Sequence, residues 1–318
     1  MVELTTIFYV LIMAVVQGVA EFLPISSSGH LLLLGKFFEL PETLTLSILL
    51  HAGTLMSVIV YFSDEIIEAC FHRPRVIFLV IVGSIPTAII AFIILKFFPE
   101  LEENLLLTGF LFIGTGILLM TILRSRCQLS EHQIYYEKIA ALEAEDEGYE
   151  PELRKTAETT TWFDAILIGI SQGVAALPGL SRSGSTISTA VGLNCEREWA
   201  AKFSFLLSIP VIGGGALLEL VKLFKAATGE TFSEKILSDP FFAVYLGGAV
   251  VSFLVGWLSL ACLMKMLREG RLHFFAYWLF IIGPCTIGYW CWLNWEKVVP
   301  YLGGQEAVDS FLKSVGIL

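Results

Sequence analysis

Residues 17–30 read QGVAEFLPISSSGH, and this stretch places polar and ionisable groups inside a segment that is otherwise apolar enough to enter a membrane. The stretch occurs a second time, because residues 172–185 read QGVAALPGLSRSGS. At a constant offset of 155 residues the copies match at Gln17 and Gln172, Gly18 and Gly173, Ser26 and Ser181, Ser28 and Ser183, and Gly29 and Gly184. The prolines, Pro24 and Pro178, miss this register by one residue. The duplication predicts a chain built from two related halves.

The two copies differ where their chemistry matters most. The three pairs that differ in this way are Glu21 and Ala176, Ser27 and Arg182, and His30 and Ser185. One copy therefore holds a carboxylate and an imidazole, and the other holds a guanidinium. This division predicts a single site to which both copies contribute.

The composition of the chain identifies a polytopic membrane protein. Of its 318 residues, 56% are hydrophobic and only 16% are charged, which is too apolar for a soluble domain of average usage. The first 35 residues contain no Lys or Arg, so we expect the apolar N-terminus to be retained rather than cleaved as a signal peptide. Residues 128–160 hold nine acids and three bases, which accounts for most of the net charge of −10. The remainder is nearly balanced and does not favour nucleic-acid binding.

The six cysteines show no CxxC pairing and mostly lie in or beside apolar segments. We interpret them as small packing residues rather than as a disulfide framework or a zinc site.

Six apolar runs are long enough to cross a bilayer, which takes about 20 helical residues. They lie at 44–62, 76–98, 105–123, 201–225, 241–264 and 274–293. Two further apolar regions, 5–38 and 163–193, are each interrupted by one copy of the Pro, Ser and Gly motif. Because each half of these regions is too short to cross alone, we predict two re-entrant helical hairpins.

Basic residues set the expected orientation of the spans. Arg73 and Arg75, then Arg124 and Arg126, then the stretch 265–271 mark three connections as cytoplasmic. The first hairpin would then enter from the outer face and the second from the inner face. Each half becomes a hairpin followed by three spans, and an odd number of spans inverts the second half relative to the first. The predicted fold is an all-α integral membrane protein with an inverted-topology repeat, six transmembrane helices and two re-entrant helical hairpins.

Four segments follow from this prediction. They are a first repeat at 1–124, an acidic cytoplasmic loop at 125–162, a second inverted repeat at 163–293 and a C-terminal tail at 294–318. Within the loop, residues 131–142 have weak helical periodicity, and we interpret the loop as a linker rather than as a docking helix.

Gln17 and Glu21 are four residues apart, so a helix places them on one face. Carboxylate and amide oxygens are ligands that hard cations prefer, and Mg²⁺ commonly combines one or two carboxylates with phosphate oxygens. One Glu and one Gln do not make a complete metal cage. They suit a divalent cation, Mg²⁺ or Ca²⁺, that arrives with a diphosphate.

After each interruption a serine-rich stretch opens a second half-helix, where free backbone N–H groups favour an anion. The candidate phosphate-binding residues are Ser26, Ser28, Gly29, Ser181, Ser183, Gly184 and Thr186. Each hydroxyl has an alternative interpretation as an ordinary helix cap. Arg182 can hold phosphate oxygens through two hydrogen bonds and stabilise charge during phosphoryl transfer. Its alternative role is an ion pair with Glu21 that only joins the halves.

His30 lies four residues after Ser26 and three after Ser27. On a helical turn it can reach either hydroxyl, so it can activate Ser27 as a nucleophile or serve an attacking water. A single His on an apolar helix is more often a packing residue, but its proximity to Glu21 and Arg182 favours a catalytic role. His51 is not ranked as catalytic.

The two motifs, with AAKFSFLLSIP at 200–210, resemble the undecaprenyl-diphosphate phosphatase family, also called BacA or UppP bacitracin-resistance proteins. The family motifs are Glu or Gln, three residues, Glu and then PxSSxGH, and PGxSRSG. The resemblance implies hydrolysis of undecaprenyl diphosphate, the C55 lipid carrier of cell-wall synthesis, to undecaprenyl phosphate and phosphate with a divalent cation. It also implies a bacterial plasma (inner) membrane location, a site open to the outer face, and roles for Glu21, Ser27, His30 and Arg182.

Two features depart from the family pattern. Position 17 is Gln where many members have Glu, which leaves Glu21 as the charged metal ligand, and the acidic loop is longer than in compact members. Inverted repeats with broken helices are also typical of transporters, so a polyprenyl-phosphate flippase is the alternative function. A lipid-phosphate phosphatase with another substrate is a third. The oligomeric state is left open.

Overall fold

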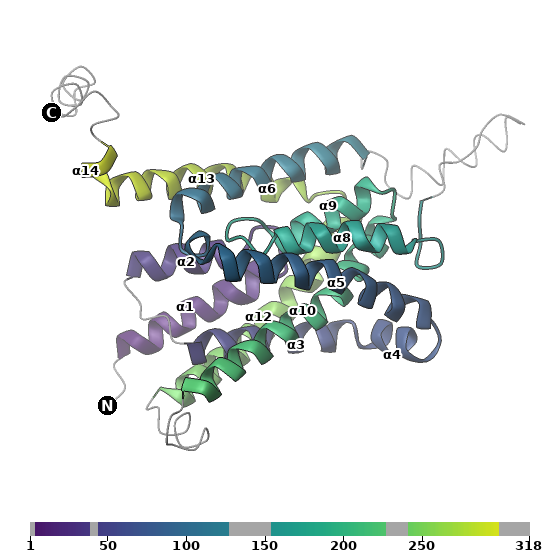
Figure 1. Ribbon diagram of the computed structural model, residues 1–318, viewed down its shortest axis with the longest axis horizontal. Helices are drawn as coiled ribbons and strands as arrows, with labels where there is room; N and C mark the ends of the chain where they lie inside the picture. Colours follow the sequence, from purple (N-terminus) through teal and green to yellow (C-terminus); the bar gives the residue numbers. More distant parts are fainter. Residues whose placement is uncertain (1–3, 39–43, 127–153, 227–240, 299–318) are drawn as a thin grey trace, which may run out of the picture.

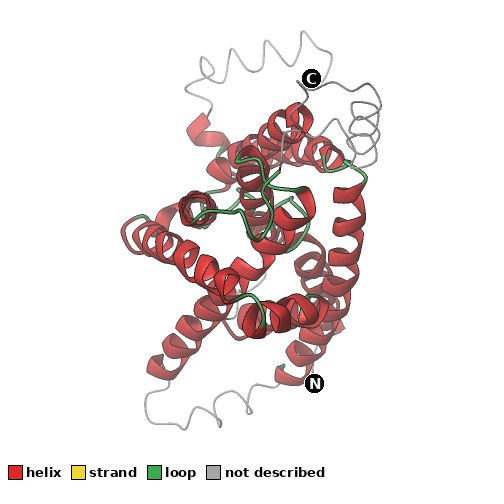
Figure 2. Ribbon diagram, turned by 90° about the vertical axis from the view of Figure 1, so that its right-hand side faces the viewer, coloured by secondary structure: helices red, strands yellow, loops and turns green. Residues whose placement is uncertain are grey.

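The computed structural model describes residues 4–38, 44–126, 154–226 and 241–298, and these residues fold as helices joined by short turns (Figures 1 and 2). The first half holds α1 (Leu4–Ala20), α2 (Ser27–Phe38), α3 (Leu44–Tyr61), α4 (Ser63–Phe71), α5 (Pro74–Phe97), η1 (Pro99–Leu101) and α6 (Leu105–Arg126). The second half holds α8 (Trp162–Val174), α9 (Arg182–Gly192), α10 (Arg197–Ala226), α12 (Phe242–Arg268), α13 (His273–Leu293) and α14 (Trp295–Val298). No strand occurs among the described residues, where an isolated bridge joins Lys155 and Cys195.

The six predicted spans coincide with α3, α5, α6, α10, α12 and α13. Within the described residues, four helices are long and apolar enough to cross a membrane by themselves, namely α5, α10, α12 and α13. A fifth candidate is the pair α3 and α4, whose axes differ by 68° across a short break. The chain is therefore a multi-pass helical membrane protein.

Two apolar regions are interrupted as predicted. The first breaks between α1 and α2, and the second breaks between α8 and α9. Ser26 ends the first break in the left-handed region, with φ 70°, and Gly179 takes φ +94° in the second. This conformation is open to Gly and strained for Ser, so the first break depends on contacts that hold Ser26 in place.

The first helix of each hairpin packs against a span of the other half. Helix α1 packs along α12, and α8 packs along α5, while α6 and α13 run side by side (Figure 1). Glycines permit the close approach. A Cβ added to Gly18 of α1 would lie 2.9 Å from the carbonyl oxygen of Ser252, and one added to Gly173 of α8 would lie 2.8 Å from Cβ of Ile90. Small residues at such contacts let membrane helices pack at backbone distance.

An aromatic cluster fixes the first break against α10. Phe22, in the break, meets Phe205 edge to face with ring centroids 5.9 Å apart, and Phe62 stacks on Phe205 at 5.5 Å. Phe22 and Phe62 are fully buried. Offset and edge-to-face aromatic pairs add stability beyond the area that they bury. The cluster therefore holds the turn that carries Glu21.

Two segments of the prediction fall partly or wholly outside the described residues. The stretch of weak helical periodicity at 131–142, interpreted as part of a linker, lies entirely outside them, and so does the C-terminal tail beyond α14. Helix α4, which was not expected, is the amphipathic stretch SDEIIEACF that follows the bend at Phe62.

Candidate functional site

Glu21 is the centre of the candidate site. It follows the last residue of α1, and its side chain is only 4% exposed. The guanidinium Nη2 of Arg182 donates to Glu21 Oε1, and Ser27 Oγ donates to Oε2 at 2.6 Å. The structure thus brings the carboxylate of the first hairpin to the arginine of the second, 161 residues away in sequence.

Gln17 lies one helical turn before Glu21 and is fully buried. Its amide Nε2 donates to Glu21 Oε2 at 3.1 Å and to Thr54 Oγ1 at 3.4 Å. The other end of the amide, Oε1, is buried without a hydrogen-bond partner among the described residues. A buried acceptor without a partner is costly, so this oxygen is suited to a ligand that supplies a donor or a positive charge.

Ser26 joins the two breaks. Its hydroxyl accepts hydrogen bonds from the backbone N–H of Gly179 at 3.1 Å and, more weakly, from Gly29 at 3.4 Å. The first bond crosses from one hairpin to the other and offsets the strain of the left-handed Ser26 backbone. Ser26 therefore acts in this structure as a cap and cross-link, with its side chain buried.

Ser181 has the matching position in the second hairpin. It is the N-cap of α9, and its hydroxyl accepts from the N–H of Gly184 at 3.1 Å. Its hydroxyl also lies 3.3 Å from that of Ser183, much as Ser26 and Ser28 lie 3.4 Å apart. Arg182 follows the cap directly and starts the helix, which aims its side chain out of the buried cap toward Glu21.

Thr115 of α6 supports the second break, a role that the motif analysis missed. Its hydroxyl donates to the carbonyl oxygen of Gly179 at 3.1 Å and accepts from the N–H of Ser181 at 3.2 Å. Thr115 is fully buried. One hydroxyl thus satisfies both a donor and an acceptor of the turn that precedes Arg182.

His30 makes different contacts from those expected. Its Nδ1 lies 2.8 Å from the carbonyl oxygen of Ser26, and its Nε2 lies 2.9 Å from Nε1 of Trp278 on α13. The expected contact between His30 and the hydroxyl of Ser27 is not present, because Ser27 Oγ is bonded to Glu21 and both ring nitrogens of His30 have other partners. Helical spacing placed the two residues near each other but could not show which way the ring turns.

The remaining predicted phosphate-binding residues differ in their surroundings. Ser28 is exposed near the start of α2, while Gly29 is buried against Phe112, whose Cζ would lie 2.6 Å from a Cβ added there. Ser183 and Gly184 are buried in the first turn of α9. Thr186 lies apart, since its fully buried hydroxyl contacts Ser204 of α10 at 2.5 Å. A phosphate role for Thr186 therefore has no support in its surroundings.

His51 also has a local partner. Its Nδ1 bonds the carbonyl oxygen of Ser47, one turn earlier in α3, at 2.9 Å. The Nδ1 side of the His51 ring is thus bonded within its own helix.

The residues present fit a divalent cation only as a partial set. No group of three or more His, Cys, Asp or Glu side chains capable of holding a metal ion occurs within the described residues. What the site offers is the Glu21 carboxylate and the unpaired amide oxygen of Gln17. Hard cations accept both oxygen types, and Mg²⁺ completes its shell with water and phosphate oxygens. The donor set fits a metal that is shared with a phosphate-bearing ligand.

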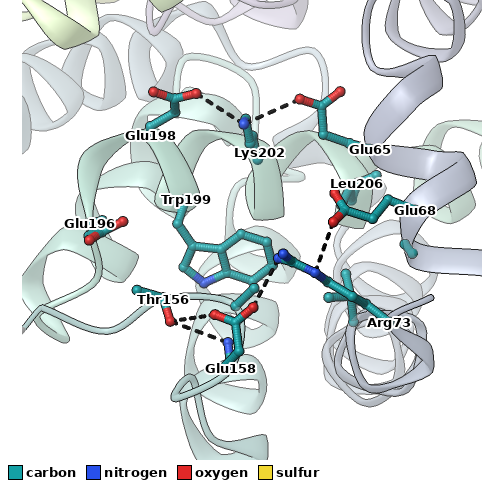
Figure 3. Close-up of a pocket in the computed structure, with 13 residues that line it drawn as sticks. Glu65, Glu68, Arg73, Thr156, Glu158, Glu196, Glu198, Trp199, Lys202 and Leu206 are labelled. Carbon is teal, nitrogen blue, oxygen red and sulfur yellow. Dashed lines mark hydrogen bonds and ion pairs between the residues drawn. The ribbon is translucent and has the colours of Figure 1, made fainter.

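A separate polar pocket of 310 Å³ lies between α4, α10 and the segment before α8 (Figure 3). Each of its two cations is held by two carboxylates: Arg73 by Glu68 and Glu158, and Lys202 by Glu65 and Glu198. The hydroxyl of Thr156, which bonds Glu158 at 2.7 Å, lowers the pKa of that carboxyl. Two of these ion pairs, Arg73 with Glu158 and Lys202 with Glu65, connect α4 and the turn after it to the segment before α8 and to α10. The pocket shares no residue with the candidate site.

Comparisons with known proteins agree with the motif analysis. The sequence model of the family described as bacitracin resistance protein BacA matches residues 10–285. An undecaprenyl-diphosphatase of Carboxydothermus hydrogenoformans is 40% identical over 279 residues, covering 87% of this chain and 94% of the relative. An undecaprenyl-diphosphatase of Rhodopirellula baltica is 40% identical over 280 residues, covering 87% and 96%. One of Halothermothrix orenii is 34% identical over 285 residues, covering 88% and 97%. The chain therefore belongs to the BacA bacitracin resistance protein family.

Proposed function

We propose that this protein hydrolyses undecaprenyl diphosphate to undecaprenyl phosphate and inorganic phosphate. The observation that carries the proposal is the buried carboxylate of Glu21, which is contacted at once by Arg182, Ser27 and Gln17. A guanidinium and a hydroxyl at two helix starts, beside a carboxylate that follows the end of α1, form a suitable site for a diphosphate. The relatives reported above are all named undecaprenyl-diphosphatase, which supports the same substrate.

The proposed architecture is an inverted repeat with six spans and two re-entrant hairpins, divided at 1–124, 125–162, 163–293 and 294–318. The exchanged packing of α1 with α12 and of α8 with α5 supports it, since each hairpin lies against a span of the other half. The equivalent glycines, Gly18 and Gly173, make the close contacts in both pairs. A two-fold relation between the halves accounts for both observations.

Arg182 and the first backbone N–H groups of α2 and α9 would hold the phosphates. Arg182 now pairs with Glu21, so a diphosphate must compete for the guanidinium. Phosphate oxygens accept two parallel hydrogen bonds from Arg, which makes this exchange favourable. The released Glu21 carboxylate would then be free for a cation or a proton.

A divalent cation, Mg²⁺ or Ca²⁺, would be held by Glu21 and by the amide oxygen of Gln17, together with the substrate's own oxygens. When bound, such a cation neutralises charge on the phosphates during phosphoryl transfer. Gln17 supports this role because its Oε1 is the one buried acceptor beside Glu21 that lacks a partner among the described residues. The amide orientation is fixed by its Nε2 bond to Glu21.

Ser27 or a water would attack the terminal phosphorus. The Ser27 hydroxyl points its proton at Glu21 over 2.6 Å, so Glu21 rather than His30 is placed to receive that proton. His30 would move the second proton of the reaction, from water to the site or from the site to solvent. Both routes end with undecaprenyl phosphate leaving and inorganic phosphate released.

The site would open to the outer face of a bacterial plasma membrane. Under the positive-inside tendency the basic connections after α4, α6 and α12 lie in the cytoplasm, so the first hairpin enters from outside. The transporter alternative is not favoured, since the named relatives carry the name of a hydrolase.

The test is a phosphate-release assay with purified protein in detergent, undecaprenyl diphosphate and Mg²⁺ or Ca²⁺. We expect release from the wild type and a loss of two or more orders of magnitude in Ser27→Ala and in His30→Gln, in line with the removal of a proton-transfer group or nucleophile. Ser185→Ala is the matched control, because Ser185 occupies the position of His30 in the second motif. We expect it to keep near wild-type activity.

Two results would contradict the proposal. Wild-type protein that binds the lipid but releases no phosphate would show that the chain is not a hydrolase. Near-normal release by both Ser27→Ala and His30→Gln would show that the chemistry lies elsewhere. Acid quenching after a brief reaction separates the two routes, since a phosphorylated serine forms only if Ser27 attacks.

A further inference from the structure

Trp278 of α13 contacts His30 through its indole N–H. Its Nε1 lies 2.9 Å from His30 Nε2, and the ring planes are nearly parallel, 13° apart, with centroids 6.0 Å apart. Phe112 of α6 packs edge to face against the same imidazole, with centroids 4.9 Å apart. His30 is thus held by aromatic side chains from a helix of each half.

The two polar partners of His30 define its tautomer. An indole N–H can only donate, so Nε2 of His30 must accept from Trp278. The carbonyl oxygen of Ser26 can only accept, so Nδ1 must carry the proton. The imidazole is therefore neutral in this arrangement, with its lone pair on Nε2.

Nε2 is the atom of His30 that would take a proton during the reaction, and its lone pair is occupied by the indole N–H of Trp278. A base cannot accept from two donors along one lone pair. Before Nε2 of His30 can receive a proton from an attacking water, the indole N–H must leave. His30 keeps its orientation when this happens, because its Nδ1–H remains bonded to Ser26.

Trp278 is placed so that a lipid tail can move it. The imidazole is buried, with 8% exposure, whereas Trp278 is 46% exposed. The same helix exposes the large apolar or aromatic side chains of Phe274, Tyr277 and Ile281. A polyprenyl chain that packs along this surface of α13 would compete with the indole for its present position through van der Waals contacts.

We infer that Trp278 is a positioning residue that keeps Nε2 of His30 covered until the polyprenyl tail of the substrate displaces the indole. The inference rests on the proposed function, because it needs His30 as the proton acceptor. Once the indole has moved, an attacking water gives a proton to Nε2, its oxygen forms the new P–O bond, and the P–O bond to undecaprenyl phosphate breaks. The binding energy of the tail would then be used to move the indole, so it would raise kcat and not only lower KM. Substrates with short tails would therefore have a lower kcat.

The experiment compares undecaprenyl diphosphate with farnesyl diphosphate, which shares the headgroup but has a short tail. Trp278→Phe keeps an aromatic ring beside His30 and removes the N–H. We expect its kcat for farnesyl diphosphate to rise about two- to ten-fold, the range for one neutral hydrogen bond, with kcat for undecaprenyl diphosphate changed less than about two-fold. Trp292→Phe, which alters an exposed Trp of the same helix, should leave the ratio of the two kcat values unchanged.

Two kinetic results would overturn the inference. Equal losses with both substrates would show that Trp278 only supports the fold, and unchanged kcat with both would show that the indole does not restrict His30. His30→Gln separates this failure from that of the proposed function. If His30→Gln retains activity, the role of His30 is wrong; if it is inactive while Trp278→Phe leaves the ratio unchanged, only the inference about Trp278 fails.

A measurement on the wild-type protein covers the case in which Trp278→Phe does not fold. With ¹⁵N-labelled histidine, the Nε2 signal of His30 is assigned by its absence from His30→Gln. We expect undecaprenyl phosphate, a product that is not hydrolysed, to shift this signal, and farnesyl phosphate to leave it in place. The same response to both lipids, or to neither, would overturn the inference.

Discussion

The two broken hairpins have nearly the same backbone plan and opposite chemistry. In each, a serine hydroxyl accepts from the N–H of a glycine three residues later, Ser26 from Gly29 and Ser181 from Gly184. In each, a buried glutamine lies on the preceding helix. The first hairpin then adds Glu21 and the second adds Arg182, and these two side chains form the ion pair between them.

The difference shows how a repeat can yield one site rather than two. Positions that match between the two motifs, such as Ser26 and Ser181, form the helix breaks and caps that both hairpins require. Positions that differ carry the charged side chains, which come together at one site between the hairpins. The second hairpin accordingly keeps Gln172 beside Ala176, where the first has Gln17 beside Glu21.

The largest expected effect comes from removing the charge that the second hairpin contributes. Arg182→Ala should lower phosphate release by about 10³-fold or more, because an arginine that stabilises transferring phosphate contributes on this scale. It should also lower the thermal midpoint in detergent, because the Glu21 carboxylate would remain buried without the guanidinium that pairs with it, at a cost of about 3–5 kcal/mol. Arg182→Lys keeps the charge and should recover stability better than activity, because Lys lacks the bidentate geometry.

The double variant sharpens this prediction. Glu21→Ala should cost less stability than Arg182→Ala, because the side chain of Arg182 is 19% exposed and can reach water, whereas that of Glu21 is 4% exposed. Combining the two should be more stable than Arg182→Ala alone. Strictly additive losses of stability would show that the two side chains are not coupled.

Much of this fold follows from the sequence because its causes are local. Apolar runs placed the six long helices, and the Pro, Ser and Gly clusters placed both breaks. The motif alignment also indicated that Arg182 meets Glu21. These predictions rest on segment length and on the need of each backbone polar group for a partner in the membrane.

What the sequence could not show depends on tertiary contacts. The partner of His30 is Trp278, 248 residues away and without any distinguishing pattern around it. Thr115 is likewise one of several hydroxyls in apolar helices, and only the fold brings it to Gly179. The bend between α3 and α4 arises where an apolar helix meets the acidic stretch SDEIIEACF, and its 68° angle depends on packing.

The matched glutamines, Gln17 and Gln172, allow a second test in which each is replaced by Glu. In the wild type the amide nitrogen of Gln17 lies 3.1 Å from Glu21 Oε2, so Gln17→Glu would place a second carboxylate beside the first. Because two carboxylates bind Mg²⁺ more tightly than one, the Mg²⁺ concentration for half-maximal activity should fall about ten-fold. In EDTA the two like charges repel, and the thermal midpoint should fall below that of the wild type. Added Mg²⁺ should restore it.

Gln172→Glu is the control for this pair. Its neighbour at the position of Glu21 is Ala176, so a carboxylate there gains no partner for a cation. Gln172 is buried and bonds the carbonyl oxygen of Leu207, so the variant should be destabilised equally with and without Mg²⁺. A cation response of the same size in both variants would contradict the assignment of the metal to the first hairpin.

The smallest expected effect concerns the matched glycines after each cap. A Cβ on Gly29 would lie 2.6 Å from Phe112 Cζ and 2.8 Å from the backbone nitrogen of Gly179, so Gly29→Ala must move a buried ring and the opposite break. A Cβ on Gly184 would meet Ser181 at 3.1 Å and Pro24 at 3.3 Å, which small shifts can relieve. Overpacking costs about 1–3 kcal/mol, whereas Ala in place of a helical Gly gains up to about 1 kcal/mol.

We therefore expect Gly29→Ala to lower the thermal midpoint clearly and Gly184→Ala to leave it nearly unchanged. Phosphate release should follow the same order, because the shift at Gly29 displaces both Ser26 and the turn before Arg182. Equal effects of the two substitutions would mean that the breaks are equally accommodating. The first hairpin is then no tighter than the second, and the asymmetry of the site would lie in its charges alone.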